Sequence, residues 1–98
     1  MDLYKITGYP HRMVMIALQK ISSVLNEIPL GKRCIIDCLI STGKQRRRLL
    51  DLGLTKGTVV EPVQKSPFGD LRAYEIRGAV IALRKEDANC IRVTYTNY

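Results

Sequence analysis

The chain has 98 residues, of which 46% are hydrophobic and 26% are charged, and its formal charge is +7 at pH 7. This length fits a single domain, because chains of about 100 to 150 residues rarely divide. Aromatic residues make up only 6% of the chain, which is few for a protein that stacks nucleic-acid bases. A basic chain can bind nucleic acid, an anionic membrane or an acidic protein. The distribution of the charges along the chain is therefore needed to distinguish between these classes of partner.

Cysteine content and hydropathy indicate the compartment. The three cysteines cannot all pair within one chain, and so small a number fits a reducing compartment better than a disulfide scaffold. The apolar stretch at residues 13–18 is shorter than the core of an export signal. No stretch approaches the roughly 18 apolar residues of a membrane-spanning helix. We therefore expect a cytoplasmic protein.

The N-terminal part of the chain divides in two. Residues 1–12 show no periodicity, whereas residues 13–25 carry apolar side chains at helical spacing and predict an amphipathic helix. A helix of this length is marginal alone, so we expect it to pack on its own domain or on a second copy of the chain, as a homo-oligomer. Its polar face has too few cations for a membrane surface.

Five later stretches have the composition of short strands. The first does not alternate cleanly, which predicts a bulge or burial on both faces, and Pro62 places the second strand beside an edge or a bulge. Tight turns separate the third, fourth and fifth strands, and residues 84–88 predict one helical turn. The five strands are expected at residues 33–40, 58–65, 71–77, 79–83 and 90–95.

One short helix separates the first two of these strands. Helix-forming residues from 44 onward place Leu49 and Leu52 on one face, and the helix is expected to stop at Gly53, since glycine adopts a left-handed conformation easily. Leu54 follows, where a helix-ending motif places an apolar residue against the last turn. Together the elements predict a mostly β domain, a small closed or nearly closed five-stranded barrel.

Metal binding and catalysis have weak support in the sequence. Cys34 and Cys38 would share one side of a regular strand, and Cys90 lies on the last strand, so a thiolate trio for a soft metal has to be considered. Against it, the chain has no Cys-x-x-Cys pair, and lone strand cysteines are usually core residues.

The carboxylates lie next to basic residues or at element ends, and no nucleophile has a base at a recognisable spacing. We expect no enzyme.

The run of three arginines has two interpretations. Arg47 and Arg48 lie four and three residues before Asp51, spacings at which ion pairs form on a helix surface. Alternatively, Arg46 and Arg47 present their guanidinium groups to an acidic partner. The remaining cations are spread over the elements, as on an ordinary solvated surface.

Four short motifs, taken in order, carry a resemblance to a known family. They are residues 25–31, residues 48–54 followed by Gly57 and Thr58, residues 66–70, and residues 82–85 with Ala88 and residues 91–93. With these motifs, the chain from about residue 22 to residue 93 resembles the FeoA domain, the ferrous iron transport protein A family. The first 21 residues have no counterpart in the usual family member, so we expect an N-terminal extension at 1–21 and the domain at 22–98. Phe68 stands where the family more often has leucine.

The resemblance implies a fold and a partner. It implies an SH3-like barrel in the bacterial cytoplasm, peripheral to the inner membrane through the large GTP-binding permease that imports ferrous iron. It carries over no catalytic residue, cofactor or metal ligand, although transient contact with Fe²⁺ is compatible with it. The same fold resembles the C-terminal domain of iron- and manganese-dependent repressors, so a metal-responsive or nucleic-acid-binding module is the alternative function. The shortage of aromatic residues argues against nucleic acid.

Because SH3-like barrels bind through their loops, the predicted docking residues lie in two places. One is the hairpin tip Pro67-Phe68-Gly69, where an exposed Phe68 beside a rigid proline would be an anchor for a partner. The other is the helix face with Arg46 and Arg47. The competing possibility is that Phe68 folds back under its own hairpin.

Overall fold

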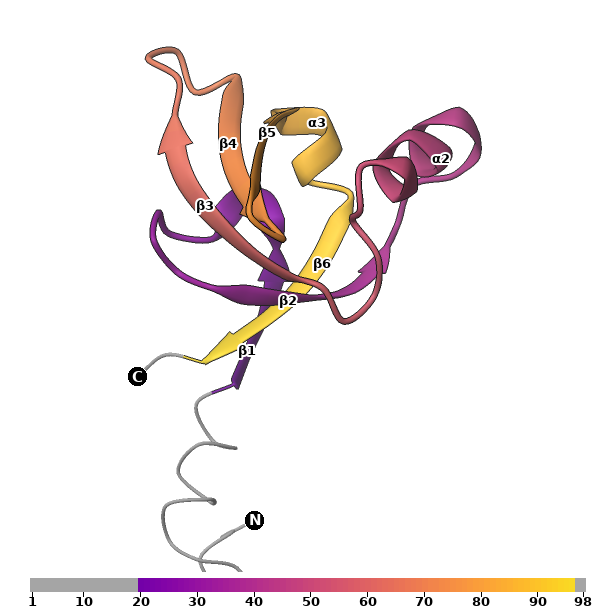
Figure 1. Ribbon diagram of the computed structural model, residues 1–98, viewed down its shortest axis with the longest axis horizontal. Helices are drawn as coiled ribbons and strands as arrows, with labels where there is room; N and C mark the ends of the chain where they lie inside the picture. The colour runs from indigo at the N-terminus through magenta and orange to yellow at the C-terminus, as the bar shows by residue number, and fades with distance from the viewer. Residues whose placement is uncertain (1–19, 97–98) are drawn as a thin grey trace, which may run out of the picture.

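The computed structural model describes residues 20–96, and strands dominate this part of the chain (Figure 1). Neighbouring strands are antiparallel, and their order in the sheet is β1-β6-β2-β3-β4-β5. The prediction of a mostly β domain is confirmed. The elements are β1 (Lys20–Val24), the 3-10 helix η2 (Leu25–Glu27), β2 (Cys34–Leu39), α2 (Gly43–Asp51), β3 (Val59–Lys65), β4 (Leu71–Ile76), β5 (Ala79–Arg84), α3 (Lys85–Ala88) and β6 (Ile91–Thr96).

The first described strand corrects the prediction of a helix over residues 13–25. Residues 20–24 are extended and pair with β6 from Lys20 opposite Thr96 to Val24 opposite Arg92. The apolar spacing was compatible with a helix, but pairing with a strand some 70 residues away determines the conformation, as tertiary contacts often override local preference. Within residues 20–96 the sheet therefore has six strands rather than the five predicted. The rest of the predicted helix, residues 13–19, lies outside the described residues.

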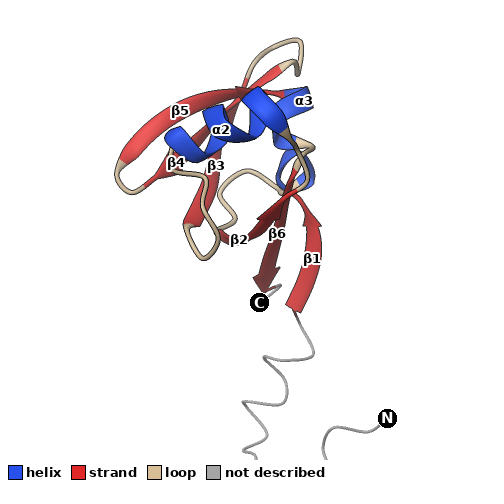
Figure 2. Ribbon diagram, turned by 90° about the vertical axis from the view of Figure 1, so that its right-hand side faces the viewer, coloured by secondary structure: helices blue, strands red, loops and turns tan. Residues whose placement is uncertain are grey.

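The closed barrel is also wrong, because the sheet is open. Strands β1 and β5 are its two edges and do not pair with each other. Figure 1 shows the sheet bending so that β4 and β5 curve back toward β6, with α3 beside them. Figure 2 shows α2 and α3 at the end of the molecule opposite to the start of β1 and the end of β6. In a closed barrel the two edge strands would pair with each other. Here helices and turns cover the core at that side instead (Figure 1 and Figure 2).

Two irregularities in strand pairing agree with the prediction. The register of β2 against β6 shifts between Ile36 and Cys38, and the register of β3 against β4 shifts between Pro62 and Gln64. Strands β2 and β3 pair over only two positions. Bulges bend and twist strands, so these two sites help the sheet to curve around its core.

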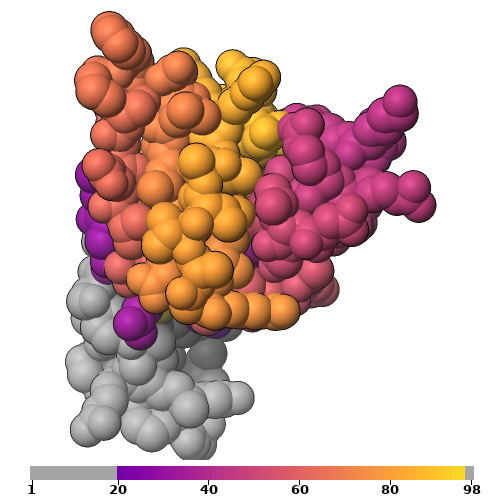
Figure 3. Space-filling view, turned by 45° about the horizontal axis from the view of Figure 1, so that its top comes forward, coloured from indigo at the N-terminus to yellow at the C-terminus, as the bar shows by residue number. Residues whose placement is uncertain are grey.

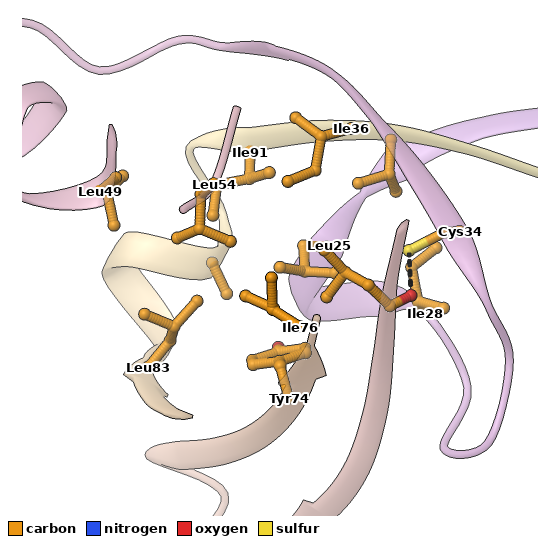
Figure 4. Packing of buried hydrophobic residues seen from close by; sticks show 13 residues of the cluster. Leu25, Ile28, Cys34, Ile36, Leu49, Leu54, Tyr74, Ile76, Leu83 and Ile91 are labelled. Carbon is orange, nitrogen blue, oxygen red and sulfur yellow. Dashed lines mark hydrogen bonds between the residues drawn. The ribbon is translucent and has the colours of Figure 1, made fainter. Parts of the chain in front are cut away.

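The core lies inside this curve and takes side chains from nearly every element (Figure 4). Its fully covered members include Leu25 and Ile28 from the turn after β1, Tyr74 from β4 and Val93 from β6. Ala88 of α3 and Leu49 of α2 complete it from the helices. The covered apolar area is the main stabilising contribution for a domain of this size.

The end of α2 confirms the predicted helix stop. The N–H of Leu54 donates to the carbonyl of Leu49 at 3.1 Å, and the N–H of Gly53 donates to the carbonyl of Leu50 at 3.0 Å. With Gly53 at φ 95°, these two bonds form the Schellman arrangement. Leu49 and Leu54 are buried together, whereas Leu52, predicted to share the face of Leu49, is exposed because it is the C-cap residue rather than part of the packed face.

Among residues 20–96, none of the helices has the length and the apolar content needed to cross a membrane.

Candidate docking surface

The hairpin that joins β3 to β4 ends in a tightly bonded turn. The N–H of Gly69 donates to the carbonyl of Ser66 at 3.0 Å, and the Ser66 hydroxyl donates to the Asp70 carboxylate at 2.8 Å while accepting from the N–H of Leu71. Pro67 fixes its own φ at the corner, and Gly69 takes a φ of 75° that side chains resist. The turn therefore has one defined shape without any partner.

This turn holds Phe68 away from the protein, with 93% of its surface exposed. The possibility that Phe68 folds under its own hairpin is thus not what the structure shows. An exposed phenylalanine on a rigid turn loses little conformational freedom when it is covered, which suits an anchor residue at an interface. Whether Pro67, Phe68 and Gly69 bind a partner stays a prediction.

The second predicted surface, on α2, is a separate projection. Figure 3 shows the helix extending to one side, with the β3–β4 hairpin on the other and the β5–α3 segment between them, as in Figure 1. Arg46 and Arg47 are exposed, and Arg46 also donates to the carbonyl of Leu39 at 3.4 Å. The structure does not bring these arginines and the hairpin tip together, so one small partner segment cannot contact both.

The contacts of Arg48, the third arginine of the run, correct the prediction of ion pairs within α2. Arg48 donates to both carboxylate oxygens of Asp87 in α3, at 2.8 and 3.0 Å, rather than to Asp51. The Gln45 amide also donates to Asp87, at 2.9 Å. Asp87 is buried, and charge-assisted hydrogen bonds from one guanidinium nitrogen of Arg48 to both of its oxygens compensate its desolvation. This contact fixes α3 against α2 and is structural.

The three cysteines lie in different surroundings. The bulge in β2 puts Cys34 in the core and Cys38 on the outside, so the shared side expected for a regular strand is lost. Cys90 is half-buried and donates to the carbonyl of Glu86. Within residues 20–96 no group of three or more cysteine, histidine or acidic side chains could hold a metal ion. The candidate trio is therefore not assembled in this part of the chain.

Cys34 itself is held as a neutral thiol. It donates to the carbonyl of Val60 at 3.3 Å, the dashed line in Figure 4. Burial, with a smaller contribution from the charge of Asp37, raises the pKa of Cys34 to about 12. Since the thiolate is the form that binds metals and attacks electrophiles, Cys34 is a core residue at neutral pH.

One set of residues beside the hairpin was not predicted from the sequence. Lys65, Arg72 and Lys85 line a hollow of about 610 Å³ together with Phe68. Arg72 is only 8% exposed and lies on the core-facing side of β4 with Tyr74 and Ile76. The sequence did contain an indication, because a charged residue alternates there in step with two apolar ones. A buried arginine of that kind needs a structural or a binding explanation.

Solved structures with the same fold define the class of protein. An FeoA-like protein from Clostridium acetobutylicum is 30% identical, superposes with a TM-score of 0.72, and the match covers 79% of this chain and 90% of that one. The zinc complex of FeoA from Stenotrophomonas maltophilia, described as a procaryotic SH3 domain protein, is 25% identical with a TM-score of 0.65, covering 76% of this chain and 98% of that one. The fold is therefore SH3-like, although its sheet is open.

The family follows from the sequence itself. The model of the FeoA domain matches residues 24–95, so the chain belongs to the FeoA domain family. The family and its link to ferrous iron transport, inferred from four short motifs, are confirmed. A relative from Porphyromonas gingivalis, the Fe(2+) transport protein A/Fe(2+) transporter FeoB fusion protein, is 33% identical over 69 residues. These are 70% of this chain but only 8% of the fusion protein.

The family match bears on the expected extension only indirectly. Strand β1 begins at Lys20, and the family model begins at residue 24. The division of the chain at residue 21 stays a prediction, as does an oligomer formed through the N-terminal segment.

Proposed function

We propose that this chain is a non-enzymatic, cytoplasmic accessory protein of bacterial ferrous iron uptake, which docks on the GTP-binding membrane permease through the tip of its β3–β4 hairpin. The observation that carries the proposal is Phe68, which is 93% exposed on a turn of fixed shape. Large apolar side chains held in this way are typical of residues that are covered by a partner.

The nature of the partner is supported by the fusion relative. In that protein from Porphyromonas gingivalis, a transport protein A segment is joined to FeoB in one chain. Two functions carried on one chain in one organism are often performed by two associating chains in another. The same association, between separate proteins, would hold this chain at the inner face of the membrane.

The helix face of α2 is the second candidate docking surface. Arg46 and Arg47 are exposed, whereas Arg48 is engaged with Asp87. Two exposed guanidinium groups on a projecting helix would contribute mainly to the rate of association with an acidic partner, and that contribution would fall with salt. The hairpin tip would contribute more to affinity, because a buried aromatic anchor supplies much of the binding energy of an interface.

The experiment is co-purification of the full chain with the permease, together with ferrous iron uptake by cells that carry each variant. Phe68→Ala is expected to reduce both, and Arg47→Glu to reduce co-purification at low salt only. Val80→Ala, at another exposed apolar position outside the hairpin, is the matched control and is expected to behave as the wild type. If Phe68→Ala and Arg47→Glu each leave co-purification and uptake unchanged, the docking surface lies elsewhere.

A further inference from the structure

The hollow beside the β3–β4 hairpin carries an excess of positive charge. Three of its lining residues, Lys65, Arg72 and Lys85, are cationic, and one, Glu27, is acidic. Phe68 and Leu30 add apolar surface at its rim, and they are 93% and 51% exposed. We refer to this site as the Arg72 hollow.

Arg72 is the least expected member of the hollow. Its guanidinium donates to the backbone carbonyls of Asn26 and Ile28 and lies 5.7 Å from the centre of the Tyr74 ring. In the described part of the chain it forms no ion pair, and its Nε is buried without a hydrogen-bond partner. Carbonyls accept from its two terminal nitrogens, but Nε stays unpaired and the charge has no counter-ion in the described part of the chain. A buried charge in that state gains strongly from an anion placed nearby.

The two lysines are held at the rim by different elements. Lys65 ends β3 opposite Arg72, and its side chain passes so close to Gly69 that an added Cβ there would lie 3.2 Å from the Lys65 Cε. Lys85 begins α3, and its N–H donates to the carbonyl of Asp70 at 3.0 Å, which ties α3 to the hairpin. Neither lysine forms an ion pair with a residue in the range 20–96. Both ammonium groups are therefore available to an incoming ligand.

We propose that the Arg72 hollow binds the carboxylate of an acidic side chain in a partner segment, with a neighbouring apolar side chain of that segment packed on Phe68 and Leu30. The proposal rests on the proposed function and specifies the chemistry of the segment recognised. A carboxylate between Lys65 and Lys85 would supply the counter-ion that Arg72 lacks. The apolar rim favours a peptide that alternates acidic and apolar residues over a free anion or a nucleic-acid backbone, which would leave Phe68 uncovered.

The test is an NMR titration of the isotope-labelled full chain with a hexapeptide of alternating glutamate and leucine, blocked at both ends. We expect the largest amide shifts at Lys65, Gly69 and Lys85. Replacing each glutamate of the peptide by glutamine should weaken binding at least about tenfold, the effect of losing one charge-assisted hydrogen bond. Replacing each leucine by serine should weaken it to a similar extent. Equal binding of the glutamine peptide, or shifts centred elsewhere, would overturn the proposal.

Variants on the rim keep the test independent of folding. The double variant Lys65→Gln, Lys85→Gln changes exposed side chains only and is expected to bind the peptide about tenfold more weakly. Lys44→Gln on α2 is the matched control and should bind as the wild type. Inorganic phosphate is the third ligand: if it shifts the same amides with the same affinity as the peptide, the hollow is a general anion site and the proposal fails.

The result is separable from that of the docking experiment. If the hexapeptide fails to bind while Phe68→Ala still reduces co-purification with the permease, the proposed function stands and the Arg72 hollow is not the recognition site. If the hexapeptide binds but Phe68→Ala and Arg47→Glu leave co-purification unchanged, the hollow recognises an acidic segment of some other protein.

Discussion

Two arginines in this domain are held in opposite ways, and the contrast separates a structural contact from a candidate binding site. Arg48 is largely exposed and pairs with both oxygens of the buried Asp87, so the charges at that corner are balanced within the chain. Arg72 is buried, donates to backbone carbonyls and lies over the Tyr74 ring, but it forms no ion pair within residues 20–96, so its charge is not balanced there. We call the first the paired corner and the second the unpaired corner. A charge that the fold has not neutralised is available to a ligand.

The largest expected effect is at the core beneath the paired corner. Leu49 is fully buried next to Arg48 in sequence, and Leu49→Ala would leave a cavity that costs about 2–5 kcal/mol. Urea unfolding would measure the loss. Because the unpaired corner uses other elements, the folded variant should still bind the alternating peptide. Loss of peptide binding at concentrations where the variant is folded would show that the two corners are coupled.

Removing the cation of the unpaired corner is expected to lower the stability somewhat less than Leu49→Ala does. Arg72→Met keeps most of the volume but leaves the carbonyls of Asn26 and Ile28 without their donors, at about 1–3 kcal/mol for each buried group left unpaired. The free energy of unfolding should fall by about 2–3 kcal/mol, discounting for water that reaches the rim. An unchanged stability would mean that Arg72 does not hold the turn after β1.

Breaking the paired corner should lower the free energy of unfolding by about 1–2 kcal/mol. Hydrogen bonds to a charged group are lost, but the exposed Arg48 can be hydrated again. The change is Asp87→Asn, which removes the charge and one acceptor for Arg48. Urea unfolding of Asp51→Asn, at the position where an ion pair within α2 was first expected, is the control and should match the wild type. A larger loss of stability in Asp51→Asn than in Asp87→Asn would show that Asp51 does form the ion pair within α2.

Alkaline pH should weaken the core near β2 rather than either corner. The pKa of Cys34 is raised from 9.0 to about 12 by burial, so the unfolded chain loses this proton before the folded one does. Stability from this group is therefore complete below about pH 9 and is lost as the pH rises toward about 12. Burial raises the pKa of Tyr74 as well, which adds a loss of the same sign.

Urea unfolding across this pH range would measure the effect. Cys34→Ala should flatten the decline, whereas Cys38→Ser, at an exposed position, should leave it as in the wild type. A decline of the same steepness in Cys34→Ala would assign the pH dependence to other groups.

The smallest expected effect on stability is at the hairpin tip. Phe68→Ala removes a side chain that packs on almost nothing, so the free energy of unfolding should change by less than about 0.5 kcal/mol. Thermal unfolding would check this value. A clear loss of stability would mean that Phe68 belongs to the fold, and any loss of docking in this variant could not then be assigned to a missing anchor.

Local features of the sequence were enough to predict part of this structure. Gly53 followed by Leu54 indicated the helix stop, Pro62 indicated the bulge in β3, and the turn at residues 66–70 indicated the hairpin. Each depends on the conformation of a few adjacent residues, which the residue types themselves restrict.

The features that sequence analysis missed depend on contacts between distant residues. Residues 20–24 are a strand because β6 lies beside them, and Arg48 bonds to Asp87 rather than to Asp51 because α3 packs against α2. The unpaired corner likewise needs β4 to approach the turn after β1. In the sequence, only the charge of Arg72 among apolar alternating residues pointed to it.

The most direct test of docking through the hairpin is an NMR titration of the labelled full chain with the soluble GTP-binding domain of the permease. We predict that the largest amide shifts fall on Phe68, Gly69 and Lys85, and that Phe68→Ala abolishes them while Arg47→Glu does not. Shifts centred on α2, or shifts that persist unchanged in Phe68→Ala, would contradict docking through the hairpin.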